Sequence, residues 1–127
     1  MTSHASGPFD VKLTPQPKDR FDRMAIDKQF HGDLEAVSAG EMISTQTATK
    51  GSAGYVAMER VTGALKGRSG SFVLQHSATM NRGVPEMSIA VVPDSGTDDL
   101  AGIAGKMRII ITGGKHSYEF DYTLAVE

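Results

Sequence analysis

The sequence predicts an all-β fold, a small antiparallel β-barrel of about eight strands. Residues 54–80 alternate apolar and polar side chains on both sides of a turn, which is the pattern of a long β-hairpin. Residues 118–126 alternate in the same way, with Tyr118 and Phe120 on one face. The other segments are short, are joined by turn residues and do not require a helix. A closed or nearly closed barrel is therefore favoured, and an open sandwich is the alternative.

The composition is that of one folded domain. The chain has 127 residues, of which 39% are hydrophobic and 22% are charged. The formal net charge is −2 and the Lys and Arg residues are scattered, so neither nucleic acid nor a membrane is expected as a partner. The sequence has no cysteine, which excludes disulfides and thiolate metal sites. It also shows no signal-peptide pattern and no long apolar run, so we expect a cytoplasmic protein.

The N-terminal part of the chain contains one segment whose secondary structure is ambiguous. Residues 1–7 are small and polar and are expected to form a flexible tail, which leaves residues 8–127 as a single β-barrel domain. Residues 9–13 alternate as a short strand, and Pro15 is expected to end this strand or to hold it at a sheet edge. Residues 21–30 fit a helix through one set of apolar residues and a strand through another. We favour the strand, in which one face carries Met24, Ile26, Lys28 and Phe30.

Turn residues separate the later strands. A turn at His31 and Gly32 leads into residues 33–44, where Ser38 and other small residues share one face and permit curvature. Residues 45–54 are expected to form a Gly/Ser/Thr loop before the long hairpin. After the hairpin, we expect strand segments at residues 87–92, 100–105 and 107–112, and a turn-rich loop at residues 93–99.

The long hairpin defines the candidate site. A loop at residues 66–69 places Leu65 opposite Gly70 and, further along the ladder, Glu59 opposite His76. Facing residues lie on one side of the sheet, and this side is otherwise apolar. The other side is mixed and suits either solvent or a subunit interface. On the first strand of the hairpin this mixed side carries Val56, Met58, Arg60 and Thr62.

Glu59 and His76 are the candidate functional pair. A carboxylate that faces an imidazole inside an apolar barrel holds the tautomer of the imidazole and raises its basicity, as a general base requires. Tyr55 lies on the same face and can add a hydroxyl group. A buried structural pair and a core tyrosine fit the same pattern without any chemistry. Tyr55, Glu59 and His76 are thus candidate ligand contacts, and His76 with Glu59 is the candidate catalytic pair.

No cofactor or metal site is indicated by the sequence. The four histidines are far apart, and no two of them have the spacing of metal ligands on one element. Residues 94–99 are acidic but lack the pattern of an EF-hand calcium loop. Phosphate-loop and serine-hydrolase motifs are absent. We therefore expect neither a cofactor nor a bound metal.

Three stretches resemble a known family: KGSAGYVAMERVTGALKGRSGSFVLQH at residues 50–76, VVPDSGTDDLAGIAG at residues 91–105 and HSYEFDYTL at residues 116–124. They are similar to the bacterial domain-of-unknown-function family 3224, and RMAIDKQFHGDL at residues 23–34 fits as well. The resemblance implies a small antiparallel barrel, similar to allene oxide cyclase and to lipocalin-like barrels, that self-associates into a homo-oligomer. It implies no established activity, because a shared fold does not define a function.

Three functions follow as hypotheses. The leading one is a barrel whose lumen binds a small, largely apolar molecule, because about eight strands can leave room for one such ligand. The second is an isomerase or cyclase in which His76 is the base and Glu59 orients it, a reaction class that the fold analogy alone supplies. The third is a structural or assembly role, in which the mixed side of the hairpin packs against a second subunit.

Overall fold

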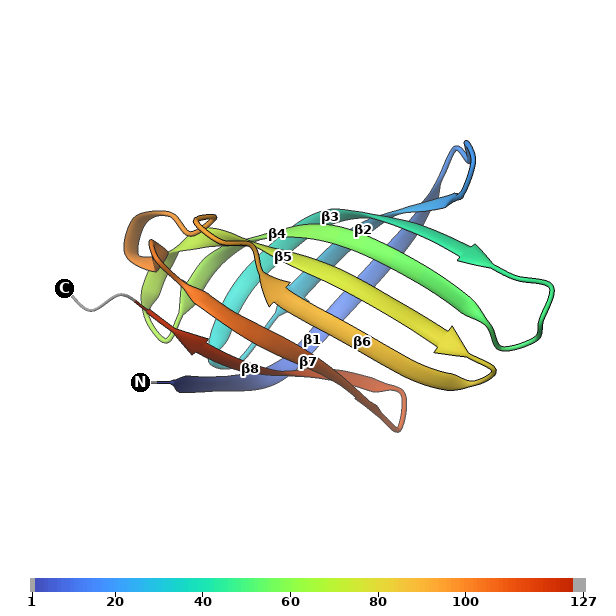
Figure 1. Cartoon of the computed structure of the whole chain (residues 1–127). Coiled ribbons are helices and arrows are strands. Elements are labelled where there is room, and N and C mark those ends of the chain that lie inside the picture. Colours follow the sequence, from blue (N-terminus) through green and yellow to red (C-terminus); the bar gives the residue numbers. More distant parts are fainter. Residues whose placement is uncertain (1, 125–127) are drawn as a thin grey trace.

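The computed structural model describes residues 2–124 and is a closed barrel of eight antiparallel strands in sequence order (Figure 1). The strands are β1 (Ser3–Gln16), β2 (Asp22–Phe30), β3 (Leu34–Gln46), β4 (Ala53–Leu65), β5 (Arg68–Asn81), β6 (Val84–Val91), β7 (Ala104–Thr112) and β8 (Lys115–Thr123). β1 closes the barrel by pairing with β8. The predicted all-β barrel is confirmed, and β2 is a strand and not a helix. In the described part of the chain, no helix has the length and apolar character needed to cross a bilayer.

One end of the barrel is packed and capped. Aromatic rings fill the lumen there: the ring centres of Phe72 and Phe120 are 5.7 Å apart, and Phe30 meets Tyr118 edge-on at 5.4 Å. The segment between β6 and β7 lies over this end and contains the short 3-10 helix η1 (Asp98–Leu100) (Figure 1). Leu100, the last residue of η1, is buried against the end of the barrel. The capped end is therefore the hydrophobic core of the protein.

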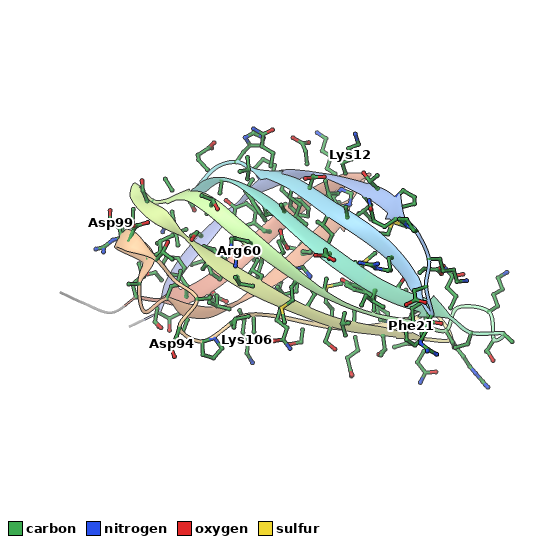
Figure 2. All side chains as sticks on the ribbon, turned by 90° about the horizontal axis from the view of Figure 1, so that it is seen from above. Lys12, Phe21, Arg60, Asp94, Asp99 and Lys106 are labelled. Carbon is green, nitrogen blue, oxygen red and sulfur yellow. The ribbon has the colours of Figure 1, made fainter. Side chains whose placement is uncertain are left out.

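The opposite end of the barrel is open. Figure 2 shows Phe21 near this end, and Asp94 and Asp99 at the capped end. Alternate residues of a strand point to the same side of the sheet, so the lumen-facing rows continue from the core toward the open end. Along these rows the exposed fraction of the apolar side chains rises toward the open end. The most exposed of them are Leu13, Met80, Met87 and Ile111.

Residues 3–7, expected to belong to a flexible tail, form the start of β1 and pair with β8. Ala5 is fully buried. His4 lies between two carboxylates, 2.6 Å from Glu119 and 2.7 Å from Asp121. The hydrogen bond to Asp121, with the neighbouring negative charges, raises the pKa of His4. The tail prediction is wrong because the strand that orders these residues lies at the other end of the sequence.

Two further boundaries differ from the prediction. β1 continues through Pro15, which pairs with Met24 on β2, while the pairing of β1 with β8 extends only to Pro8. Pro15 therefore lies at a sheet edge, the second of its two predicted places. The strand predicted at residues 100–105 is wrong, because η1 and a turn occupy most of it and β7 begins at Ala104. Its apolar residues, Leu100 and Ile103, fill the capped end instead. Residues 1 and 125–127, which include parts of the predicted tail and of the last strand, lie outside the described residues.

The turn of the central hairpin is shorter than predicted. Lys66 and Gly67 form a two-residue turn with φ values of 47° and 86°. This backbone is the one that a type I′ turn requires. Leu65 therefore pairs with Arg68 and not with Gly70, so the predicted four-residue loop is wrong. The register moves by two residues, and both faces of the hairpin keep their predicted residues because side chains alternate with a period of two.

β6 and β7 are the least paired neighbours in the barrel. They share the single register pair Ala90–Lys106. By contrast, β7 and β8 pair from Ala104 opposite Thr123 to Thr112 opposite Lys115. The wall of the lumen is therefore least continuous between β6 and β7.

Candidate functional site

Glu59 lies at the centre of a buried polar network in the lumen. Its side chain is 0% exposed. Its Oε1 atom is 2.7 Å from Nε2 of His76 and 3.1 Å from Nζ of Lys28. Its Oε2 atom accepts a hydrogen bond of 2.5 Å from the hydroxyl of Ser38. These partners come from β5, β2 and β3, so one carboxylate on β4 connects four strands.

The structure brings Glu59 and His76 together as predicted, although in a different register. Glu59 lies opposite Leu74, and His76 lies opposite Ala57. The two residues are thus diagonal neighbours on one face, a separation that long side chains can bridge. Their hydrogen bond is independent of the register error because that error is two residues and leaves both side chains in the lumen.

The protonation of Glu59 follows from its partners. Burial by itself would raise the pKa of Glu59, but the hydrogen bond from His76, the charge of Lys28 and the hydroxyl of Ser38 outweigh burial and hold this pKa below its ordinary value. Glu59 is therefore a carboxylate at neutral pH. A carboxylate accepts hydrogen bonds and cannot donate them, so Nε2 of His76 is the donor. In the neutral imidazole, Nδ1 then carries the lone pair.

Lys28 is the member of the network that sequence patterns missed. Its side chain is buried, with Nζ 5.1 Å from the ring centre of Phe9 and 5.8 Å from that of Phe30. The ring faces stabilise the ammonium, and Glu59 balances its charge. The signal was available: a lysine on the same strand face as Phe30 needs a buried carboxylate. Ser38 gives a weaker signal of the same kind on β3.

Tyr55 lies on the lumen side of β4 toward the open end, outside the network. Its hydroxyl donates a long hydrogen bond to the sulfur of Met87 at 4.0 Å, and a thioether is a weak acceptor. Partial burial and then the negative charge of Glu59 raise the pKa of Tyr55. The field of Glu59 therefore extends from the buried network to the open half of the lumen.

The open half of the lumen contains a hollow of about 220 Å³. It is lined mainly by thioether, hydroxyl and small side chains from β3 to β6, Tyr55 among them, and also by Gln46 and Glu86. His76 and Glu59 do not line it and lie deeper in the barrel. Its main apolar and small lining residues are Ala53, Ala78, Met80, Pro85 and Met87.

A comparison with known proteins identifies the family. The family model described as "Protein of unknown function (DUF3224)" matches residues 5–122. The chain belongs to this family. A crystal structure of a DUF3224 protein of unknown function from Shewanella oneidensis MR-1 is 47% identical in sequence, covers 99% of this chain with 100% of its own, and superposes with a TM-score of 0.95. No curated protein matches the chain. The sequence resemblance is confirmed, and with it the barrel.

The outer wall of this DUF3224 barrel has a second hollow, of about 560 Å³, that crosses β1 to β4. Asp27, Ala39 and Arg60 lie side by side along it on β2, β3 and β4. Figure 2 shows Arg60 on the outer face. Within residues 2–124, neither Asp27 nor Arg60 has an ion-pair partner. These charges are thus available to a partner.

Metal ligands do not converge in the described part of this DUF3224 chain. No group of three or more His, Asp or Glu side chains in residues 2–124 is arranged to hold a metal ion. The buried network has one imidazole and one carboxylate, and Lys28 occupies the position next to them that a cation would take. The network is therefore suited to hydrogen bonding.

Proposed function

We propose that the protein binds a small, largely apolar molecule in the open half of its lumen. The observation that supports this most directly is the exposure of large apolar side chains on lumen-facing rows, 63% for Ile111 and 49% for Met87. Clustered exposed apolar side chains commonly mark the binding site of a ligand or a partner. The packed end of the barrel provides the floor of this site.

The size and lining of the site narrow the ligand class. Sites for drug-sized molecules measure roughly 300–1,000 Å³. A hollow of about 220 Å³ therefore favours a smaller molecule. Met80 and Met87 supply flexible, polarizable side chains that adapt to different shapes. The site thus suits a small apolar molecule better than a highly charged one.

Replacing Met87 with Lys is expected to weaken binding of the neutral fluorophore N-phenyl-1-naphthylamine by roughly tenfold or more, which corresponds to about 1.4 kcal/mol. The ammonium group would have to be desolvated beside the ligand. Fluorescence titration measures the dissociation constant. Ser88→Lys is the matched control, because Ser88 is the next residue on β6 and points outward, and its affinity should equal that of the wild type. Equal weakening in both variants, or no saturable binding by the wild type, would contradict the proposal.

Self-association is a second candidate function, favoured by the outer face of β3 and β4. Val37, Ile43, Val56 and Met58 all point outward and are exposed, Val56 by 53%. A two-fold axis along β3 would place Arg60 of each copy opposite Asp27 of the other, because Ala39 lies between them. We therefore propose that a second copy of the chain covers this face, which is the homo-oligomer expected from the sequence.

Val56→Lys is expected to convert the associated form into a monomer, because each copy would bury an unpaired ammonium in the interface. Size-exclusion chromatography with light scattering at micromolar concentration measures the mass. Val84→Lys is the control, since Val84 is 67% exposed on β6, away from this face. A monomeric wild type would contradict the assembly proposal.

The isomerase or cyclase hypothesis stays a prediction. His76 and Glu59 are at the distance of a base and its orienting carboxylate, 2.7 Å. Their exposures of 3% and 0% are, however, those of a structural pair. This burial favours a binding protein over an enzyme, and we assign no reaction.

A further inference from the structure

We infer that the lumen ligand carries a neutral hydroxyl group at its inner end, and that Nδ1 of His76 accepts a hydrogen bond from it. The inference rests on the proposed binding function and adds a chemical class: a small apolar alcohol or phenol, in preference to a carboxylate.

His76 is a buried polar side chain with one nitrogen in use. Nε2 is bonded to Glu59, and Nδ1 has no hydrogen-bond partner among residues 2–124. Within the same residues, no fully buried side-chain nitrogen or oxygen lacks a partner. Nδ1 therefore keeps a small accessible area on the lumen side, although the residue as a whole is buried.

The direction of Nδ1 follows from the position of Glu59. Glu59 pairs with Leu74, which lies nearer to the capped end of β5 than His76 does. The two ring nitrogens point to different sides of the imidazole, so with Nε2 held toward the capped end, Nδ1 faces away from it. The next residue on this face of β5 is Ala78, which pairs with Tyr55. Both Ala78 and Tyr55 line the hollow. Nδ1 of His76 therefore lies two residues along β5 from the inner end of the hollow, on the same face of the strand.

Tyr55 supplies the complementary group. Among residues 2–124 its hydroxyl has only the weak thioether contact with Met87 at 4.0 Å, so its proton is available to a ligand oxygen. A ligand hydroxyl can thus donate to Nδ1 of His76 and accept from Tyr55. An ether oxygen can accept from Tyr55 but cannot satisfy Nδ1, because it has no proton to donate.

The charges in the lumen oppose an anionic ligand. Glu59 is ionised, and its negative charge acts on Tyr55 at the edge of the hollow. The positive charge of Lys28 is already neutralised by Glu59 and held over the rings of Phe9 and Phe30. The neutral imidazole that the inference assumes for His76 adds no positive charge, so a carboxylate at the inner end of a ligand would meet the like charge of Glu59 without a cation to balance it.

Three probes with equal numbers of non-hydrogen atoms test the inference: 1-octanol, heptyl methyl ether and heptanoate. Each is titrated against the full chain loaded with N-phenyl-1-naphthylamine, whose displacement gives the affinity. 1-Octanol is expected to bind roughly tenfold more tightly than either of the others, the effect of one additional hydrogen bond. His76→Phe should abolish the preference, so that the alcohol and the ether bind with about equal affinity. Tyr55→Phe leaves the Glu59 network intact and should weaken the alcohol and the ether alike.

Each other outcome has a distinct meaning. Equal affinity for the three probes, tightest binding of heptanoate, or an alcohol preference that persists in a folded His76→Phe variant would overturn the hydroxyl inference while lumen binding stands. If His76→Phe does not fold, an unchanged affinity for both alcohol and ether in Tyr55→Phe overturns it. Failure of the wild type to bind N-phenyl-1-naphthylamine and all three probes would overturn the proposed function as well.

Discussion

Glu59→Gln is expected to lower the free energy of unfolding by about 3–5 kcal/mol. Glutamine keeps the volume of the side chain but removes the charge that balances Lys28, and it leaves that ammonium buried without a counter-ion. Its amide group also replaces one of the two oxygens that accept from His76 and Ser38. Urea denaturation followed by circular dichroism measures the change.

The matched control is Glu41→Gln. The Glu41 side chain is 81% exposed, and one of its oxygens is 3.4 Å from Arg23. Exposed ion pairs contribute about 0–1 kcal/mol, so this variant should be nearly as stable as the wild type. A similar loss in both variants would show that the charge of Glu59 does not stabilise the fold.

The same proteins also give a pH signature. Because the pKa of Glu59 is lower in the folded state than its ordinary value of 4.5, its ionisation stabilises the fold fully above that value. This stabilisation is lost as the pH falls through the lower, folded-state pKa. The stability gap between the wild type and Glu59→Gln should therefore narrow below pH 4.5. A gap that stays constant from neutral to acid pH would be inconsistent with the network.

Leu100→Ala is expected to lower the free energy of unfolding by about 2–5 kcal/mol, the range for large-to-small changes in a packed core. Leu100 is 1% exposed and belongs to the segment that caps the barrel. Leu13→Ala removes the same atoms at the open end, where Leu13 is 46% exposed, and should cost less than about 1 kcal/mol. The same urea titrations compare the two. If the two losses were equal, the capped end would not be the better-packed half.

Local sequence patterns were sufficient to predict most of the strands and which side chains face the lumen. A period of two places Glu59, His76 and Tyr55 on the lumen side in the predicted register and in the observed one, because the two differ by two residues and such a shift returns every side chain to the same face. The register itself depends on the turn. The stretch that begins at Lys66 and Gly67 suits a two-residue or a four-residue loop, and only the folded backbone distinguishes them.

Long-range pairing accounts for what the sequence did not reveal. Lys28 on β2 binds a carboxylate on β4, and that contact depends on how the barrel curves. Residues 3–7 become a strand because β8 lies beside them. Leu100 and Ile103 resemble strand residues but are buried because the chain folds back over the end of the barrel. In each case the partner is far away in sequence, beyond the reach of periodicity.

The single Ala90–Lys106 pair makes the junction between β6 and β7 the part of the wall that is easiest to separate. Elsewhere, changing the circumference requires breaking a continuous ladder, as between β7 and β8. At this line the wall can spread with the loss of one pair, and Met87 and Ile111 stand on the two strands that would part. We therefore expect the lumen to widen more easily between β6 and β7 than along any other pair of strands, while the capped core keeps its packing.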